Sequence, residues 1–137
     1  MITEDYVSFE TAKLLKEKGF DTVVRHYYQK IDDDITYHIG DFLNWNVFDM
    51  WYSMPTLQMA MKWLREVHKL VICAEIGNEN YTGNTDYSNP DIWYWFFDIT
   101  NEKGVVIDTE SDFVLNEYAT YEEACEAGIK YCLENLI

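Results

Sequence analysis

The chain has 137 residues, of which 48% are hydrophobic and 17% aromatic, and its net charge is −15. This length fits one domain with a single core, and the aromatic content excludes a disordered acidic chain, which would be poor in such residues. The negative charge argues against direct binding to nucleic acid, because contacts to phosphates depend on basic side chains. We therefore expect a single folded domain over residues 1–137.

Acidic residues are distributed unevenly along the chain. Residues 70–137 contain fourteen acidic and two basic residues, which is a net charge of −12. Residues 1–69 contain eleven acidic and eight basic residues, which is a net charge of −3. The excess negative charge of residues 70–137 repels other polyanions and opposes compaction of the chain.

The first part of the chain, residues 1–52, predicts one helix, a weak hairpin and an aromatic segment. Ser8 is a favoured N-cap residue and Gly19 a favoured stop, so a helix is expected between them. Segments 22–28 and 35–39 flank a run of three aspartates and indicate the two strands of the hairpin.

The aromatic segment follows the hairpin. Its members recur mostly at three-residue steps, which is typical of a turn or short helix that packs against the core. The alternative is the wall of a ligand pocket, because such pockets are lined mostly by apolar and aromatic side chains. The cluster consists of Phe42, Trp45, Phe48, Trp51 and Tyr52.

The second part of the chain, residues 53–137, predicts a helix, several strands and a closing helix. The first of these helices begins near Pro55 and runs to about His68, with one apolar stripe. The closing helix begins at Thr120, where Glu123 lies three residues further on and completes a capping box.

Strands are expected between these two helices. Residues 70–76 and 92–100 are rich in β-branched and aromatic side chains, and 105–107 pair with the second strand across a four-residue turn. A long loop at 77–91 joins the first two strands, and 113–119 add a short extended segment. The expected fold class is α+β, with an antiparallel sheet of three or more strands packed against about three helices.

The strand at 92–100 has apolar side chains on both faces, because successive residues of a strand point to opposite faces. Trp93, Trp95 and Phe97 share one face. Three interpretations are open: burial of both faces within the monomer, a self-association or partner surface, and a platform that stacks bases or sugars. The near-absence of basic residues in this half opposes the stacking of bases.

Six acidic residues form a second candidate surface. Alternation places Asp108, Glu110 and Asp112 on one face of a strand, and the start of the closing helix adds three more. Either these residues are a solvated rim, or they imitate the phosphates of a short stretch of DNA. The helical members are Glu122, Glu123 and Glu126.

Catalytic, metal and cofactor sites find no support in the sequence. The three histidines lie on separate elements, and no metal-binding, nucleophile or phosphate-binding motif is present. Three cysteines without metal-binding spacing are typical of buried free thiols in a reducing compartment. No apolar stretch reaches the length of a membrane span and no signal peptide is evident, so we expect a cytoplasmic protein without membrane contact.

Three predicted helical segments resemble those of an uncharacterised family of small acidic proteins encoded by bacteriophages and mobile elements of gut anaerobes. They are SFETAKLLKEKGF at 8–20, PTLQ and KWLREVH within 55–68, and YEEACEAG at 121–128. This resemblance implies a phage-derived cytosolic protein and transfers no functional residues, because each segment is an amphipathic helix with its cap. From Pro55 onward, the order of helix, strands and helix is similar in topology to double-stranded RNA-binding domains, whose phosphate-binding basic residues are replaced here by glutamates.

Three functions follow from these observations. The first is a non-enzymatic interaction protein, expected to be a homodimer or to bind a host protein, that uses the aromatic strand around Trp93 and Trp95. The alternative is an acidic mimic of nucleic acid that occupies a DNA-binding host protein. The third is a small-ligand-binding protein or enzyme built on the aromatic segment.

Overall fold

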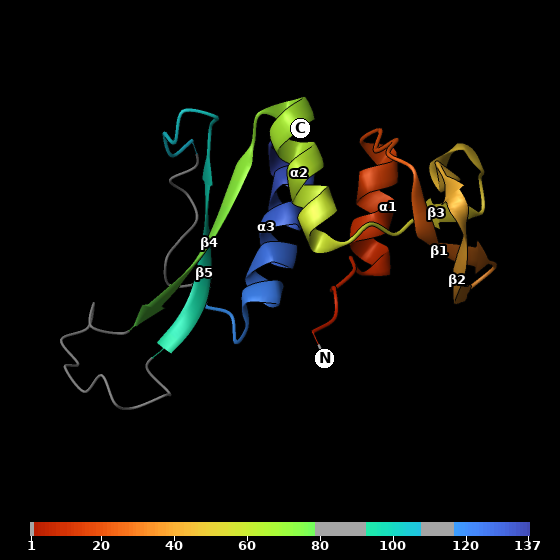
Figure 1. The fold of residues 1–137 in the computed structure, drawn as a ribbon, viewed down its shortest axis with the longest axis horizontal. Helices are drawn as coiled ribbons and strands as arrows, with labels where there is room; N and C mark the ends of the chain where they lie inside the picture. Colours follow the sequence, from red (N-terminus) through yellow and green to blue (C-terminus); the bar gives the residue numbers. More distant parts are fainter. Residues whose placement is uncertain (1, 79–92, 108–116) are drawn as a thin grey trace.

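The computed structural model describes residues 2–78, 93–107 and 117–137 (Figure 1). These residues contain three α-helices, one short 3-10 helix and five strands, so the α+β class is confirmed. In chain order the elements are α1 (Phe9–Glu17), β1 (Val24–Ile31), β2 (Asp34–Leu43), η1 (Trp45–Val47), β3 (Trp51–Ser53), α2 (Leu57–His68), β4 (Val71–Asn78), β5 (Trp93–Thr100) and α3 (Tyr121–Asn135).

The described strands form two antiparallel sheets, where the sequence predicts a single sheet. One sheet has the order β2-β1-β3 and the other consists of β4 and β5. The two sheets lie at opposite ends of the molecule, with the helices between them (Figure 1). The physical reason is that β3 turns back onto β1, pairing Ser53 with Tyr27, before the chain leaves through α2.

N-cap side chains set the starts of all three helices, and two of them, Ser8 and Thr120, are the caps that the sequence predicts. The side chains of Ser8, Thr56 and Thr120 each accept a hydrogen bond from the backbone N–H three residues further on. The second helix therefore begins at Leu57, slightly later than the start near Pro55 that the sequence predicts, because Thr56 is its N-cap.

The expected turns also form. Asp32 and Asp33 join β1 to β2, and Asp32 adopts a left-handed backbone with φ of 54°. Beyond β5 the chain turns at Gly104, with φ of 80°, and Val106 pairs with Thr100 in an isolated bridge. Most of the loop expected at 77–91 and of the segment expected at 113–119 lies outside the described residues.

The core lies where the helices meet the two sheets. Close approach of α3 to the sheet of β4 and β5 depends on Gly128, which is buried. A Cβ atom at this position would lie 2.8 Å from Cγ2 of Ile72 and 3.4 Å from the ring of Phe97. The largest fully buried aliphatic side chains in this core are Leu15, Leu64, Ile99, Ile129 and Leu133.

Gly128→Ala should therefore destabilise the protein by about 1–3 kcal/mol through overpacking, although alanine alone favours a helix by about 1 kcal/mol. Urea unfolding measures the change. The same substitution in an Ile72→Ala background, which removes the clashing methyl group, should cost less. An increase in stability on the wild-type background would contradict the tight contact between α3 and β4.

Candidate interaction surfaces

The aromatic strand β5 packs its Trp95 and Phe97 side against α3. Phe97 is only 3% exposed, and its ring centroid lies 6.0 Å from that of Tyr131 on α3. Trp95 is half-buried, with its ring 5.5 Å from that of Tyr121, whereas Trp93 is 39% exposed. Phe97 therefore belongs to the core and cannot contribute to a surface, which corrects the expectation for this residue.

The aromatic segment 42–52 runs from the end of β2 through η1 into β3, and part of it packs on the sheet of β1 to β3. Trp45 is buried, stacks on Tyr27 with ring centroids 3.9 Å apart, and donates a 2.8 Å hydrogen bond from Nε1 to the carbonyl of Val24. Phe42 and Phe48 are 67% and 45% exposed. The buried half of the segment is core, as one of the two interpretations predicts.

The candidate acidic surface divides into parts with different surroundings. Asp108, Glu110 and Asp112 lie outside the described residues. Glu122 is exposed, and Glu123 is bound to its own helix start, where Oε2 accepts a hydrogen bond from the backbone N–H of residue 119. The three described glutamates therefore do not form one solvated row, because the third of them turns inward.

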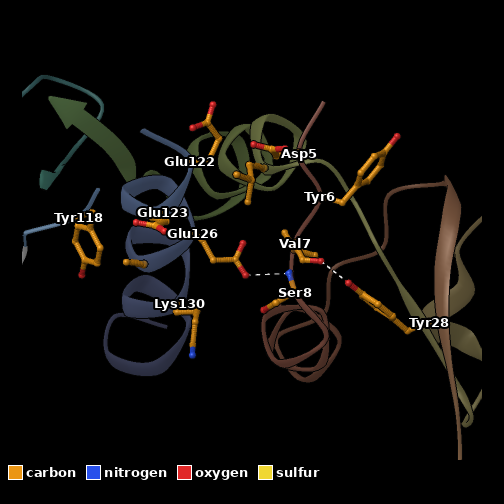
Figure 2. Close-up of a pocket in the computed structure, with 12 residues that line it drawn as sticks. Asp5, Tyr6, Val7, Ser8, Tyr28, Tyr118, Glu122, Glu123, Glu126 and Lys130 are labelled. Carbon is orange, nitrogen blue, oxygen red and sulfur yellow. Dashed lines mark hydrogen bonds between the residues drawn. The ribbon is translucent and has the colours of Figure 1, made fainter. Parts of the chain in front are cut away.

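That third residue, Glu126, connects α3 to the start of α1 (Figure 2). Its Oε1 accepts hydrogen bonds from the backbone N–H of Ser8 at 2.9 Å and from Oγ1 of Thr11 at 2.6 Å. Thr11 is fully buried, and Oε2 of Glu126 is also buried and has no hydrogen-bond partner among the described atoms. The Glu126 carboxylate is thus a structural link between two helices.

An open pocket of about 550 Å³ adjoins this link, between the chain before α1 and the side of α3 that faces it (Figure 2). On one wall Tyr28 donates a 2.8 Å hydrogen bond to the carbonyl of Val7, and burial, followed by the charge of Glu126, raises the pKa of Tyr28. On another wall a 3.0 Å hydrogen bond to Glu10 raises the pKa of Lys130. Several of the polar groups around this pocket are thus engaged in holding elements together.

Glu126→Ala should lower the free energy of unfolding by about 1.5–3 kcal/mol, the usual range for hydrogen bonds to a charged group. Glu122→Ala, one turn earlier on the same helix and exposed, is the matched control and should change it by less than about 0.5 kcal/mol. Chemical denaturation followed by tryptophan fluorescence measures both. Equal effects of the two substitutions would show that Glu126 is only a surface charge.

Strand β2 is exposed in a way that the sequence does not predict. Among the described strands it pairs only with β1, so it is an edge strand of ten residues. Ile35, Tyr37 and Ile39 point to one side of it and are 44%, 50% and 56% exposed. We call these three residues the β2 strip. Their alternation with Thr36 and His38 was visible in the sequence, but nothing there showed that β2 lies at an edge.

The backbone groups of the β2 strip also point outward. On β1, the N–H of Lys30 donates to Met50, and the carbonyl of His26 accepts from Met54, so these β1 residues direct their backbone toward β3. Their partners across the hairpin belong to the strip: Lys30 pairs with Ile35 and His26 with Ile39. In an antiparallel ladder such partners direct their own N–H and C=O groups to the opposite side, which is away from β1.

The central residue of the strip is held from the side of β1. The Tyr37 hydroxyl lies 2.6 Å from Nδ1 of His26, and Nε2 of the same ring lies 3.1 Å from the Tyr6 hydroxyl. Burial, and then the charge of Arg25, lower the pKa of His26, which favours the neutral ring in this chain of contacts. Contacts with β1 thus hold the strip, and none of the described strands pairs with its outer edge.

The chain shows no significant match to known protein families, curated proteins or solved structures. Within the described residues, no helix is long and apolar enough to cross a membrane, and no group of three potential ligand side chains is placed to hold a metal ion. The described cysteines, Cys73, Cys125 and Cys132, are free thiols, and burial raises the pKa of Cys125.

Proposed function

We propose that this is a non-enzymatic interaction protein that self-associates through the β2 strip. The observation that carries the proposal is the coincidence of two features on one edge strand. The strip exposes three large apolar side chains, and its backbone donors and acceptors point outward. Exposed edges of this kind pair with other chains unless they are protected by charges or covered by another element. The charged residues of β2, Asp34 and Asp41, lie outside the strip, on either side of it.

The proposed class of function is the one that the sequence predicts, but the proposed contact surface is the β2 strip and not the aromatic strand. The first expectation was the aromatic strand, of which Trp93 is 39% exposed and Phe97 is buried. The three residues of the β2 strip are each more exposed than Trp93, and their strand has a neighbour on one side only among the described strands. The free thiols and the resemblance to phage proteins support a cytoplasmic protein of mobile-element origin.

A mimic of nucleic acid is the second candidate, supported by the net charge of −12 over residues 70–137. Of its helical residues, Glu122 is exposed, whereas Glu123 and Glu126 accept hydrogen bonds from the protein itself. Capture of a DNA-binding protein that is released by ~0.5 M salt would favour this candidate, because screening weakens attraction between charges.

Self-association is tested by light scattering over a concentration series, at low salt and at ~0.5 M salt. We expect the mass to rise toward twice that of the chain, at lower concentration in high salt, because salt screens the repulsion between copies of charge −15. A single-chain mass under every condition would refute the proposal.

The surface is tested by Ile39→Lys, which should give a monomer because it places a charge on the strip. Val67→Lys on α2 is the matched control, since both side chains are 56% exposed and both changes add the same charge. Circular dichroism confirms that both variants fold. Equal dissociation by the two substitutions would show that the β2 strip is not the contact surface.

A further inference from the structure

We propose that a cleft beside Arg25 binds a small carboxylic acid with one apolar ring, and that the Arg25 guanidinium receives the carboxylate. The cleft has a volume of about 210 Å³. It lies between residues 24–26 of β1, Phe42 of β2 and residues 54–59, with Tyr6 on a further side, and we call it the Arg25 cleft. No residue of the β2 strip lines it, so its test does not depend on self-association.

The Arg25 cleft lies at an irregularity in the pairing of β1 with β2. Between Val24 and His26, β1 advances by two residues while β2 advances by four. Such a bulge bends its strand and re-aims nearby side chains, and bulges are frequent beside functional sites. Arg25 is the β1 residue at this irregularity, and its Nε donates a 3.0 Å hydrogen bond to the carbonyl of Gly40 in the bulged part of β2.

The walls of the cleft are mostly apolar and are held by local contacts. Val24 is 5% exposed, and Pro55 is fully buried. The rings of Tyr6 and His26 lie against each other with centroids 4.4 Å apart, and the N–H of Met54 donates a 2.9 Å hydrogen bond to the carbonyl of His26. An apolar cavity of about 150 Å³ is large enough for benzene, so this cleft has room for one ring with a short chain.

The charge of the cleft favours an anion as the occupant. Of the described residues that line it, Arg25 supplies a positive charge and none is acidic. Asp41 lies in the same bulge, but no ion pair between described residues includes Arg25. The pocket beside Glu126, by contrast, is lined by the acidic residues Asp5, Glu122, Glu123 and Glu126. An arginine in a cleft without acidic residues is therefore a distinctive feature of a chain with a net charge of −15.

The guanidinium of Arg25 has donors that a carboxylate can use. Its Cζ lies 5.6 Å from the centroid of the Phe42 ring, which also lines the cleft. Its Nε is engaged by Gly40, whereas no hydrogen bond joins its Nη groups to a described residue. Paired N–H groups of arginine match the two oxygens of a carboxylate. An acid whose ring contacts the apolar walls and whose carboxylate reaches Arg25 would use both features of the cleft.

Three probes with the same ring test the site on the wild-type protein: phenylacetate, the neutral phenylacetamide and the cationic phenethylamine. Titration followed by ¹H–¹⁵N NMR at ~0.15 M salt measures their affinity and locates them, with distant charges largely screened. We expect phenylacetate to bind with a Kd of about 1 mM, about fivefold more tightly than phenylacetamide, and phenethylamine to bind the cleft most weakly. The amide signals that shift with phenylacetate should include those of His26, Thr56 and Met59, which line the cleft.

Arg25→Gln should weaken phenylacetate binding about fivefold and leave phenylacetamide binding unchanged, because it removes the charge but not the apolar walls. Arg65→Gln on α2 is the matched control, since it removes the same charge from an exposed residue that does not line the cleft. The NMR spectra report whether each variant folds, and the three probes decide on the wild-type protein if Arg25→Gln does not.

Three results would overturn the proposal. The first is equal affinity of the wild-type protein for phenylacetate and phenylacetamide, or no binding of either. The second is an equal loss of phenylacetate binding in Arg25→Gln and Arg65→Gln. The third is a set of phenylacetate-induced shifts that lies at the pocket beside Glu126 and not at the Arg25 cleft. Self-association is measured separately by light scattering, so each of these results leaves the proposed function standing.

Discussion

The position of α1 between two separate layers is the constraint on which the rest of the structure depends. One side of α1 contacts β3, and the other side contacts α3. Thr11, Ala12 and Leu15 are completely buried as a result. Because the two sheets lie at opposite ends, this helix and its hydrogen bonds to Glu126 connect the sheet of β1 to β3 with the rest of the core.

The same arrangement explains why β2 is exposed. The ring of Phe9 on α1 makes edge contacts with Tyr28 of β1 and Tyr52 of β3, with centroids 5.7 and 5.0 Å apart. Lys16 at the other end of α1 donates hydrogen bonds to backbone carbonyls of the η1–β3 segment, including that of Trp51 at 2.8 Å. These contacts centre α1 on β1 and β3, so the outermost strand extends beyond the cover that one short helix provides.

Local chemistry made the helices predictable from the sequence, and long-range pairing made the sheets unpredictable. Caps such as Ser8 and Thr120 act within three residues, and a turn such as that at Asp32 acts within four. The division into two sheets depends on β3, a strand of only three residues whose pairing with β1 spans more than twenty positions. A strand so short carries no periodic pattern that a sequence can reveal.

Candidate residues with the same pattern in the sequence also acquired different roles. Trp93 and Phe97 share a face of β5, but only the second lies over α3 and is buried. Glu126 has the same chemistry as Glu122, and its role is fixed by Ser8, which is 118 positions away in the chain. Such roles depend on which distant elements meet. In a half of the chain with fourteen acidic residues, the sequence does not distinguish a glutamate that links two helices from one that is exposed.

A long exposed edge and a strong negative charge are compatible if association stops at two copies. Self-association through β2, as proposed, would use the long edge of each copy and leave β3 as the other edge of its sheet. β3 has three residues, so it offers a poor template for further strands, whereas β2 has ten. A charge of −15 on each copy adds repulsion that grows with every further addition. A closed dimer would thus cover the exposed edge of β2, while the short β3 and the charge oppose growth into larger assemblies.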